Sequence, residues 1–263
     1  MLTDITIGQH IPGNSIIHKL DPRIKIIITI ILITALFLVA KFTGFALYLV
    51  YIIAIILVSK LPVKRVLKGL KPIFFLVILT LLLHIFLTKG GTVYWQWRFI
   101  SIEEEGLMTG LFMVSRILLL IMFTSLLTLT TSPLQLTDGI EYLLHPLKRF
   151  GVPAGELSMM MTIALRFIPT LLAEADKIMK AQMARGADFE SGNIIQKARS
   201  LIPLLVPLFI SAFRRADELA LAMESRCYRG GEGRTRLHEL KIKKKDIIAL
   251  ILSIIVAFGI SFF

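Results

Sequence analysis

The sequence predicts an all-α integral membrane protein with about five transmembrane helices and a cytoplasmic helical insert. Of the 263 residues, 56% are hydrophobic, and the mean hydropathy is +0.77. Soluble domains of this size are less apolar and space their apolar residues periodically, whereas this chain gathers them in long continuous runs. Basic residues flank those runs, as the positive-inside rule predicts for a protein held in a lipid bilayer.

Five apolar runs define the predicted transmembrane helices. The first two are near the lower limit of roughly 17 residues for crossing the hydrocarbon core, and the short link between them predicts a tight helical hairpin. We expect residues 1–131 to hold a cytoplasmic N-terminal segment and four spans, residues 132–245 the insert, and residues 246–263 the last span. The spans lie at about 24–40, 42–58, 73–88, 106–131 and 246–263.

The distribution of Lys and Arg orients the chain. Of the 30 basic residues, 26 lie on the side of the N-terminus and the insert, and three lie on the other side. The positive-inside rule therefore predicts that the N-terminus and the insert are cytoplasmic, and five spans then leave the C-terminus outside. The larger group has three basic residues in 1–25, five in 59–72 and 18 in 132–245, and the smaller group is Lys41, Lys89 and Arg98.

The first span follows the helix-start sequence Asp21-Pro22-Arg23. Pro22 disfavours helix at Asp21 and suits the first turn of the helix that follows, so Asp21 is predicted to cap that helix by accepting from its free amides. A second interpretation is open, in which this segment contacts the cytosolic part of the chain or a partner.

Residues 89–105 connect the third and fourth spans outside the membrane. Tyr94, Trp95 and Trp97 suit the membrane–water boundary, where amphipathic rings are enriched. The sequence of residues 93–100 alternates in the manner of a short hairpin lying on the outer surface.

Arg116 lies inside the fourth span. A charge within the hydrocarbon is costly, so it usually contacts the interior of the helix bundle or a transport pathway. Alternatively, the long side chain reaches toward the outer boundary from about 15 Å along the helix. The sequence leaves both interpretations open.

The insert, residues 132–245, has the apolar spacing of amphipathic helices. We expect a short helix after Ser132-Pro133, a long helix from Ala154 to Arg185 that Pro169 kinks, and a helical region over 194–226. Pro203 and Pro207 are expected to break this last region, and Gly230, Gly231 and Gly233 to end it.

Two features of the insert have alternative explanations. Residues 201–213 are apolar but too short to cross a bilayer, so they pack on the other insert helices or lie at the lipid boundary. The methionines of the insert fill a core, or else they form an adaptable binding surface, because the flexible thioether packs against varied partners.

Two segments of the insert share one sequence frame at an offset of 41 residues. Residues 175–186 and 216–227 both begin with Ala-Asp, and both end in an arginine between two small residues. The helix dipole favours a cation at a helix C-terminus, which explains one arginine but not a repeated frame. Small neighbours let a helix end approach another protein closely, and arginine can make a forked pair with a carboxylate.

The sequence lacks the motifs of an enzyme or a cofactor-binding protein. Its five histidines lack partners at metal-ligand spacing, and the loop Gly-x-x-x-x-Gly-Lys-Ser/Thr is absent, so the chain cannot bind ATP in that manner. Cys227 is the single cysteine, which excludes an intramolecular disulfide. The net charge of +12 comes from residues beside apolar spans, so it does not indicate nucleic-acid binding.

The chain resembles the transmembrane (T) component of energy-coupling factor (ECF) transporters, which are ABC-type importers of vitamins and metal ions. The resemblance covers nearly the whole chain, and the first and last motifs together are specific. The second arginine motif reads Ser-Arg-Cys instead of Ala-Arg-Gly, but it keeps the arginine between two small residues. The matching residues are 20–25 (Leu-Asp-Pro-Arg-Ile-Lys), 184–186 (Ala-Arg-Gly) and 225–231 (Ser-Arg-Cys-Tyr-Arg-Gly-Gly).

The resemblance implies a non-catalytic subunit without a cofactor, in the plasma membrane of a prokaryote. In that family the two motifs end coupling helices that dock in grooves of two cytosolic ATPase subunits. The chain would transmit their ATP-driven motion to a separate substrate-binding (S) subunit in the membrane. The expected coupling residues are Ala184, Arg185, Gly186, Ser225, Arg226 and Cys227, and the expected structural or partner contacts are Asp21, Pro22, Arg23 and Arg116.

Two other classes of protein fit the sequence less well. An integral membrane enzyme needs paired carboxylates or a metal cluster, whereas the acids of the insert are spaced as helix-face charges. A self-contained carrier or channel would show discontinuous-helix signals in matching halves, which the spans lack. Copurification of two ATPase chains distinguishes the ECF interpretation from both.

Overall fold

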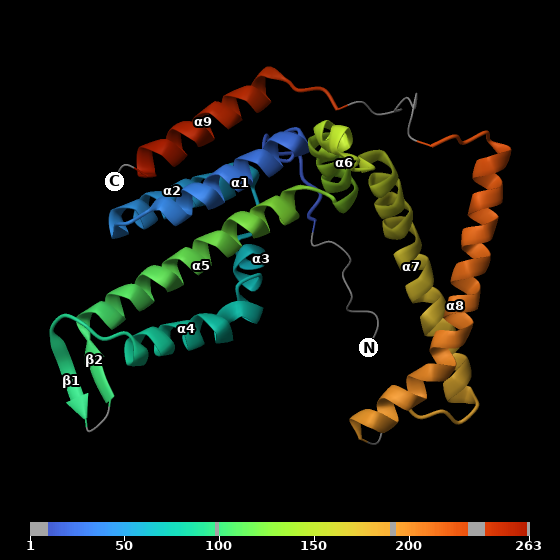
Figure 1. Cartoon of the computed structure of the whole chain (residues 1–263), viewed down its shortest axis with the longest axis horizontal. Coiled ribbons are helices and arrows are strands. Elements are labelled where there is room, and N and C mark those ends of the chain that lie inside the picture. The colour runs from blue at the N-terminus through green and yellow to red at the C-terminus, as the bar shows by residue number, and fades with distance from the viewer. Residues whose placement is uncertain (1–9, 98–99, 190–192, 231–239, 262–263) are drawn as a thin grey trace. The chain divides into compact units, whose positions relative to one another are not determined.

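The computed structural model describes residues 10–97, 100–189, 193–230 and 240–261 (Figure 1). Helices dominate these residues, and the strands among them pair as one hairpin, so the predicted all-α class is confirmed. The chain divides into two compact units, with residues 8–139 and 240–263 in one and residues 140–239 in the other.

The first unit contains the predicted spans. Each of the five is a helix whose ends lie within two residues of the predicted limits, because a continuous apolar run satisfies its backbone polar groups internally only as a helix. Residues 262 and 263, at the end of the fifth, lie outside the described residues. The helices are α1 (Pro22–Leu38), α2 (Phe42–Ser59), α4 (Phe74–Leu87), α5 (Glu104–Thr130) and α9 (Lys244–Ser261).

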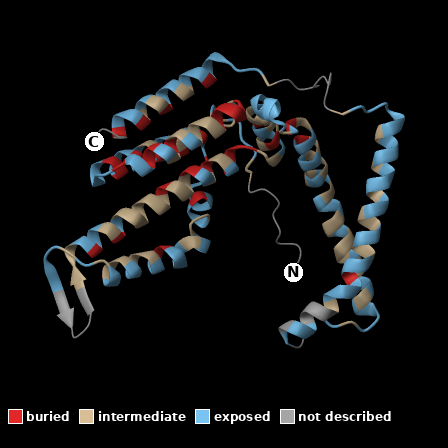
Figure 2. Cartoon of the chain, viewed as in Figure 1, coloured by how far each residue is buried: buried red, intermediate tan, exposed pale blue. Residues whose placement is uncertain are grey.

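Helix α5 forms the centre of this bundle, since α1, α2 and α4 all pack against it, and α1 also packs against α9. The side chains of Leu36, Tyr48 and Ile52 are fully buried between these helices. The ring of Tyr48 meets that of Phe123 edge to face, with centroids 5.9 Å apart, which is a favourable aromatic arrangement. Figure 2 shows buried positions along the helices of this bundle, among positions of intermediate and full exposure.

The outer faces of the bundle are apolar and exposed. Leu38, Phe75 and Leu87 keep 66%, 77% and 71% of their surface. Water would make such extended apolar surface unfavourable, whereas lipid tails cover it at no cost. The bundle is therefore that of a multi-pass integral membrane protein.

Length and composition alone select a slightly different set of spans. Among the described helices, the stretches 42–59, 63–87 and 104–130 are long and apolar enough to cross a membrane, and so is 154–184 in the insert. Helix α1 has only 17 residues, and α9 begins with the charged residues Lys244, Lys245 and Asp246. By length and hydropathy, these two helices are therefore weaker candidates for membrane spans. The cytoplasmic position of residues 154–184 thus stays a prediction.

The connections between spans contain two short elements and one predicted hairpin. Residues 59–72, taken as a basic connection, also form α3 (Val63–Lys68) and a 3-10 turn, η1 (Lys71–Ile73). The expected hairpin is present, since β1 (Val93–Trp97) pairs antiparallel with β2 (Ile100–Glu103), which extends three residues past the predicted stretch 93–100. Its position on the outer surface stays a prediction. Arg98 and Phe99, at its tip, lie outside the described residues.

The insert contains the predicted helices. Helix α6 (Pro133–Leu144) begins with a reciprocal cap, in which the amides of Ser132 and Gln135 each donate to the other's side chain, and it leads into a 3-10 turn, η2 (His145–Phe150). Helix α7 (Ala154–Ala184) contains Pro169, where a kink is predicted, and contacts α8 (Ile194–Ser225). The prediction that Gly230 ends the last helical region was wrong, because α8 ends at Ser225 and its last turn closes through the amides of Cys227 and Tyr228. Gly231 and Gly233, the other two predicted stops, lie outside the described residues.

The prediction that Pro203 and Pro207 break the last region was wrong, because α8 is one continuous helix. The two prolines are four residues apart, so their missing backbone bonds lie on one face, and the other faces keep theirs. Figure 1 shows α8 changing direction in its N-terminal half, where both prolines lie. The prolines bend the helix without ending it.

The insert helices leave much of their apolar surface uncovered. Phe209, Ile210 and Phe213 of α8 are 59–67% exposed, so they do not pack on the other insert helices. Met160 and Met161 of α7 are 57% and 50% exposed, which favours the binding-surface interpretation for these two methionines. The sequence shows the periodicity of apolar residues along a helix, but it does not show which neighbour covers the apolar face.

Candidate functional site

Helix α7 ends in a turn closed by two backbone hydrogen bonds. The helix stops one residue before Arg185, and Gly186 adopts a left-handed conformation with φ +89°. The Gly186 amide donates to the Met183 carbonyl at 2.9 Å, and the Ala187 amide donates to the Gln182 carbonyl at 3.0 Å. This pair of bonds is the Schellman motif, which satisfies the last carbonyls of a helix.

Helix α8 ends in the same turn at the same positions of the repeated frame. The Cys227 amide donates to the Glu224 carbonyl at 2.9 Å, and the Tyr228 amide donates to the Met223 carbonyl at 3.0 Å. Arg226 occupies the position of the first arginine, with φ −92°. The repeat in sequence is therefore also a repeat in structure, and each arginine is the C-cap residue of its helix.

The residues around both arginines are exposed. Within the described part of the chain, neither guanidinium forms an ion pair with an acidic side chain, and the small neighbours leave both approachable from solvent. Each guanidinium is therefore available for a forked pair with a carboxylate of another protein. The exposed set comprises Ala184, Arg185, Gly186, Ser225, Arg226 and Cys227.

Cys227 is held in a conformation that suits glycine, since its φ is +57° and glycine occupies the equivalent position of α7. The left-handed conformation costs an L-residue with a Cβ atom about 1–2 kcal/mol. Glycine avoids this cost, but it loses more conformational entropy on folding, which offsets part of the gain. We expect Cys227→Gly to stabilise the last turn of α8 by about 0.5–1 kcal/mol, measured by hydrogen exchange of the Cys227 and Tyr228 amides. Gly186→Ala is the matched control and should loosen the end of α7 instead. Faster exchange in Cys227→Gly would contradict this account.

Helices α7 and α8 are clamped together where their frames correspond. The Arg215 guanidinium donates to one carboxylate oxygen of Glu174 at 2.7 Å, and the Ser211 hydroxyl donates to the other at 2.6 Å. Glu174 and Arg215 are 41 residues apart, which is the offset of the repeat. Each arginine of the repeat thus lies 11 residues beyond the clamp, about 16 Å along its helix at 1.5 Å per residue. This pair was not predicted from the sequence, although the residue before each Ala-Asp carries opposite charges in the two copies.

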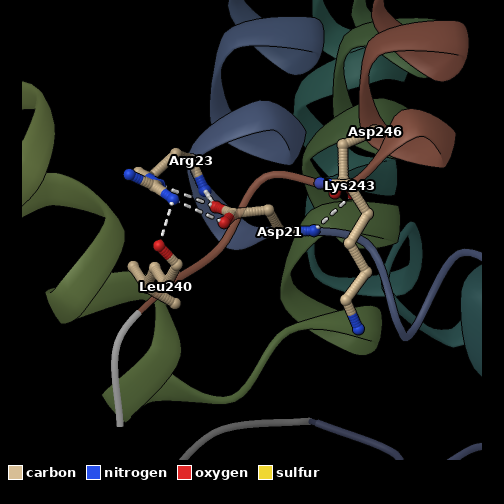
Figure 3. A network of polar contacts seen from close by, with 5 residues as sticks. All are labelled: Asp21, Arg23, Leu240, Lys243 and Asp246. Carbon is tan, nitrogen blue, oxygen red and sulfur yellow. Dashed lines mark hydrogen bonds and ion pairs between the residues drawn. The ribbon is translucent and has the colours of Figure 1, made fainter.

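The start of α1 is a buried ion pair, shown in Figure 3. The Arg23 guanidinium donates to both oxygens of Asp21, at 2.9 and 2.8 Å, and the two side chains are only 5% and 3% exposed. Asp21 also accepts from the Arg23 amide at 2.9 Å, so the predicted cap is confirmed. Pro22 occupies the first turn, as predicted.

The same pair holds the segment that leads into α9 (Figure 3). Arg23 donates to the Leu240 carbonyl at 2.9 Å, and the Asp21 amide donates to Asp246 at 2.9 Å. The other oxygen of Asp246 accepts from the Lys243 amide. Both interpretations of the Asp21 segment therefore hold, since it caps its helix and also contacts a distant part of the chain.

The buried charged groups near the start of α1 are stabilised by hydrogen bonds and by opposite charges. Burial alone would raise the pKa of Asp21, but the hydrogen bonds and the charge of Arg23 outweigh it and keep that pKa below its ordinary value. Nearby, the buried Lys25 ammonium donates to the carbonyls of His18 and Thr130, at 3.1 and 3.0 Å. Lys25 was predicted as a flanking charge and as part of the matching motif 20–25, whereas the contacts with Asp246 and Leu240 were not predicted.

Arg116 contacts the interior of the bundle. Its guanidinium donates to the Val39 carbonyl at 3.2 Å, at the C-terminus of α1, where the helix dipole favours a cation. The same group lies 5.6 and 6.0 Å from the ring centroids of Phe37 and Phe45, within cation–π range. Val39 and Phe37 lie at the end of α1 that faces the predicted outer boundary, so the side chain contacts the bundle and also extends toward that boundary.

Comparison with known proteins identifies the family. The model of the family CbiQ, described as cobalt transport protein, matches residues 13–237, which include the Asp21 segment and both arginine helix ends. The energy-coupling factor transporter transmembrane protein of Clostridium kluyveri is 59% identical over 256 residues, which cover 97% of this chain and 95% of that protein. The chain belongs to this transporter family.

Family membership is supported over the entire length of the chain. The energy-coupling factor transporter transmembrane protein of Bacillus subtilis is 47% identical over 263 residues, 100% of this chain and 99% of that protein. The counterpart from Thermosediminibacter oceani is 58% identical over 258 residues, 98% and 97% of the two chains. The resemblance found in the sequence is confirmed, and the chain is a membrane component of an energy-coupling factor transporter, which implies a non-catalytic part of a larger complex.

Proposed function

We propose that this chain is the subunit that converts the movement of two cytosolic ATPases into movement of a substrate-binding subunit in the membrane. ATP hydrolysis is then a property of the partners. The transported compound is a micronutrient, either a vitamin or a metal ion. The cobalt transport family and the relatives named for energy-coupling factor transporters support this class of substrate.

One observation carries the proposal: α7 and α8 end in identical turns that present Arg185 and Arg226 to solvent. Two equivalent helix ends suit two equivalent acidic grooves, one on each ATPase. The Glu174–Arg215 clamp joins the helices at corresponding positions, so a push on either arginine reaches the other helix through a hydrogen-bonded ion pair.

Copurification tests the proposal. The tagged full chain is isolated from its own membranes, and the retained proteins are identified by mass spectrometry. We expect two ATPase chains and a small substrate-binding membrane protein. A chain that transports substrate without an ATPase would be a self-contained carrier, and the coupling proposal would be wrong.

The exposed apolar face of the insert is proposed to contact the substrate-binding subunit. Met160 is 57% exposed in α7, and a helix surface this apolar needs a partner or lipid to cover it. We expect Met160→Asp or Leu172→Asp to weaken retention of the substrate-binding subunit about tenfold, while ATPase retention changes less than twofold, because a charge buried in an apolar contact lacks a partner. The readout is quantitative pull-down of both partners. Equal loss of both would contradict the assignment.

The plasma membrane is the proposed location, with the N-terminus and the insert in the cytoplasm. The 26-to-three distribution of basic residues supports this orientation. In a Cys227→Ser background, Glu104→Cys should react with an impermeant maleimide in intact cells, and Ser225→Cys should react only after lysis. The reverse pattern would invert the proposed topology.

A further inference from the structure

The membrane bundle contains an apolar cavity that the proposed function does not use. The cavity lies between α1, α2, α5 and α9, and its volume is about 500 Å³. Ile28, Ile55, Phe123 and Leu252 form part of its wall, which is almost entirely apolar. Pockets of this size and character hold small amphipathic or apolar ligands.

A basic mouth adjoins this cavity. A second hollow of about 400 Å³ is lined by Lys19, Lys243, Lys244 and Lys245, and it shares Lys245 with the apolar cavity. All four lysines are exposed, and within the described part of the chain none of their ammonium groups pairs with an acid.

The acid that faces this mouth is already engaged. Asp246 also lines the second hollow, but its carboxylate accepts hydrogen bonds from the amides of Asp21 and Lys243. Figure 3 shows the Lys243 side chain extending away from the Asp21–Arg23 pair, so its ammonium takes no part in that network. The mouth therefore presents a cluster of free positive charges beside an apolar chamber.

We propose that the two hollows form one site for an anionic glycerophospholipid of the bilayer. An acyl chain fills the apolar cavity, and the phosphate lies among the lysines. Lysine ammonium groups bind phosphate as point charges, and α9 begins at Lys244, so the mouth lies where the last span meets the headgroup region. A free phosphate would leave the apolar chamber unfilled, and a neutral lipid would leave the lysines without a counter-charge.

The bound lipid would bridge α1, α2, α5 and α9 beside the Asp21–Asp246 contact. This site does not depend on docking of the ATPases, so it can be tested separately from the coupling proposal. The probe is dioleoyl phosphatidylglycerol, compared with dioleoyl phosphatidylcholine, both offered to the purified full chain in mixed detergent micelles. Native mass spectrometry counts the lipid retained.

Two kinds of variant test the two halves of the site. Lys243→Gln with Lys244→Gln and Lys245→Gln should lower phosphatidylglycerol retention on the order of 10- to 100-fold, since each lysine adds attraction to an anionic headgroup. The matched control replaces three exposed basic residues outside both hollows, Lys64→Gln, Arg65→Gln and Lys68→Gln, and should change retention less than about threefold.

A cavity-filling variant tests the apolar half with every lysine in place. Ala249 and Ala54 line the cavity from different helices, so Ala249→Phe and Ala54→Phe occupy the acyl chain's position independently. Either should reduce phosphatidylglycerol retention while leaving the circular dichroism spectrum unchanged. Equal retention of phosphatidylcholine, equal loss in the control triple variant, or displacement of the lipid by inorganic phosphate alone would each overturn the proposal.

Discussion

Replacing both arginines of the repeat, Arg185→Ala with Arg226→Ala, is expected to abolish assembly with the ATPases. Each guanidinium is exposed at a fixed helix end, ready to pair with an acidic groove. Truncating one partner of a buried interfacial charge pair typically costs about 2–5 kcal/mol, because the other charge loses its counter-ion. In each single variant, the remaining contact still holds the complex together at high effective concentration. The double variant loses both contacts, so it should bind the ATPases far more weakly than either single variant.

The single variants separate docking from helix capping. Each should weaken one docking site while the other holds the complex, and Arg→Lys should rescue only in part, because lysine lacks the fork. If each arginine only capped its own helix, its loss would cost about 0.3–1 kcal/mol of stability and leave ATPase binding intact. The measurements are ATPase pull-down and substrate-stimulated ATP hydrolysis in the reconstituted complex.

A charge-matched control excludes a general loss of basic surface. Lys177→Ala with Arg214→Ala removes two exposed cations from the same two helices, away from their ends. This control should assemble and hydrolyse ATP like the unmodified chain. A double Arg185, Arg226 variant that couples normally would disprove the role assigned to these residues.

Arg23→Ala is expected to destabilise the membrane bundle by about 3–5 kcal/mol, since it leaves Asp21 as an unpaired buried charge. It also removes the bond to the Leu240 carbonyl that holds the segment before α9. The free energy of unfolding in mixed micelles measures the effect. Asp176→Ala is the control, because its pair with Lys180 is exposed and should contribute less than about 1 kcal/mol.

The effect of Arg23→Ala should depend on pH. The pKa of Asp21 is lowered in the folded chain, so the unfolded chain binds its proton more readily, and the pair adds stability above the ordinary Asp pKa of about 3.9. As the pH falls from there through the folded pKa, that contribution is lost. The difference between the two chains should therefore shrink below about pH 4, and a constant difference would show that the ion pair is not its source.

Sequence alone determined the elements that local chemistry controls. Apolar runs gave the limits of the spans, because an isolated segment in lipid must satisfy its own backbone. Asp21 was recognised as a cap because side chain and amide lie two residues apart. The repeated arginine frame was visible because the two segments share residue types at an offset of 41 residues. Gly186 was predicted to end its helix because that stop depends on local backbone bonds.

Tertiary structure alone decided which distant groups meet. Arg23 and the Leu240 carbonyl are 217 residues apart, and Glu174 pairs with Arg215 across two helices, contacts that no periodicity encodes. Two prolines in α8 were expected to break it, yet the bonds on its other faces keep it whole. The contacts of Arg116 with Val39 and Phe37 were not predictable from the sequence, because a charge within a span is stabilised by the groups that the fold brings to it.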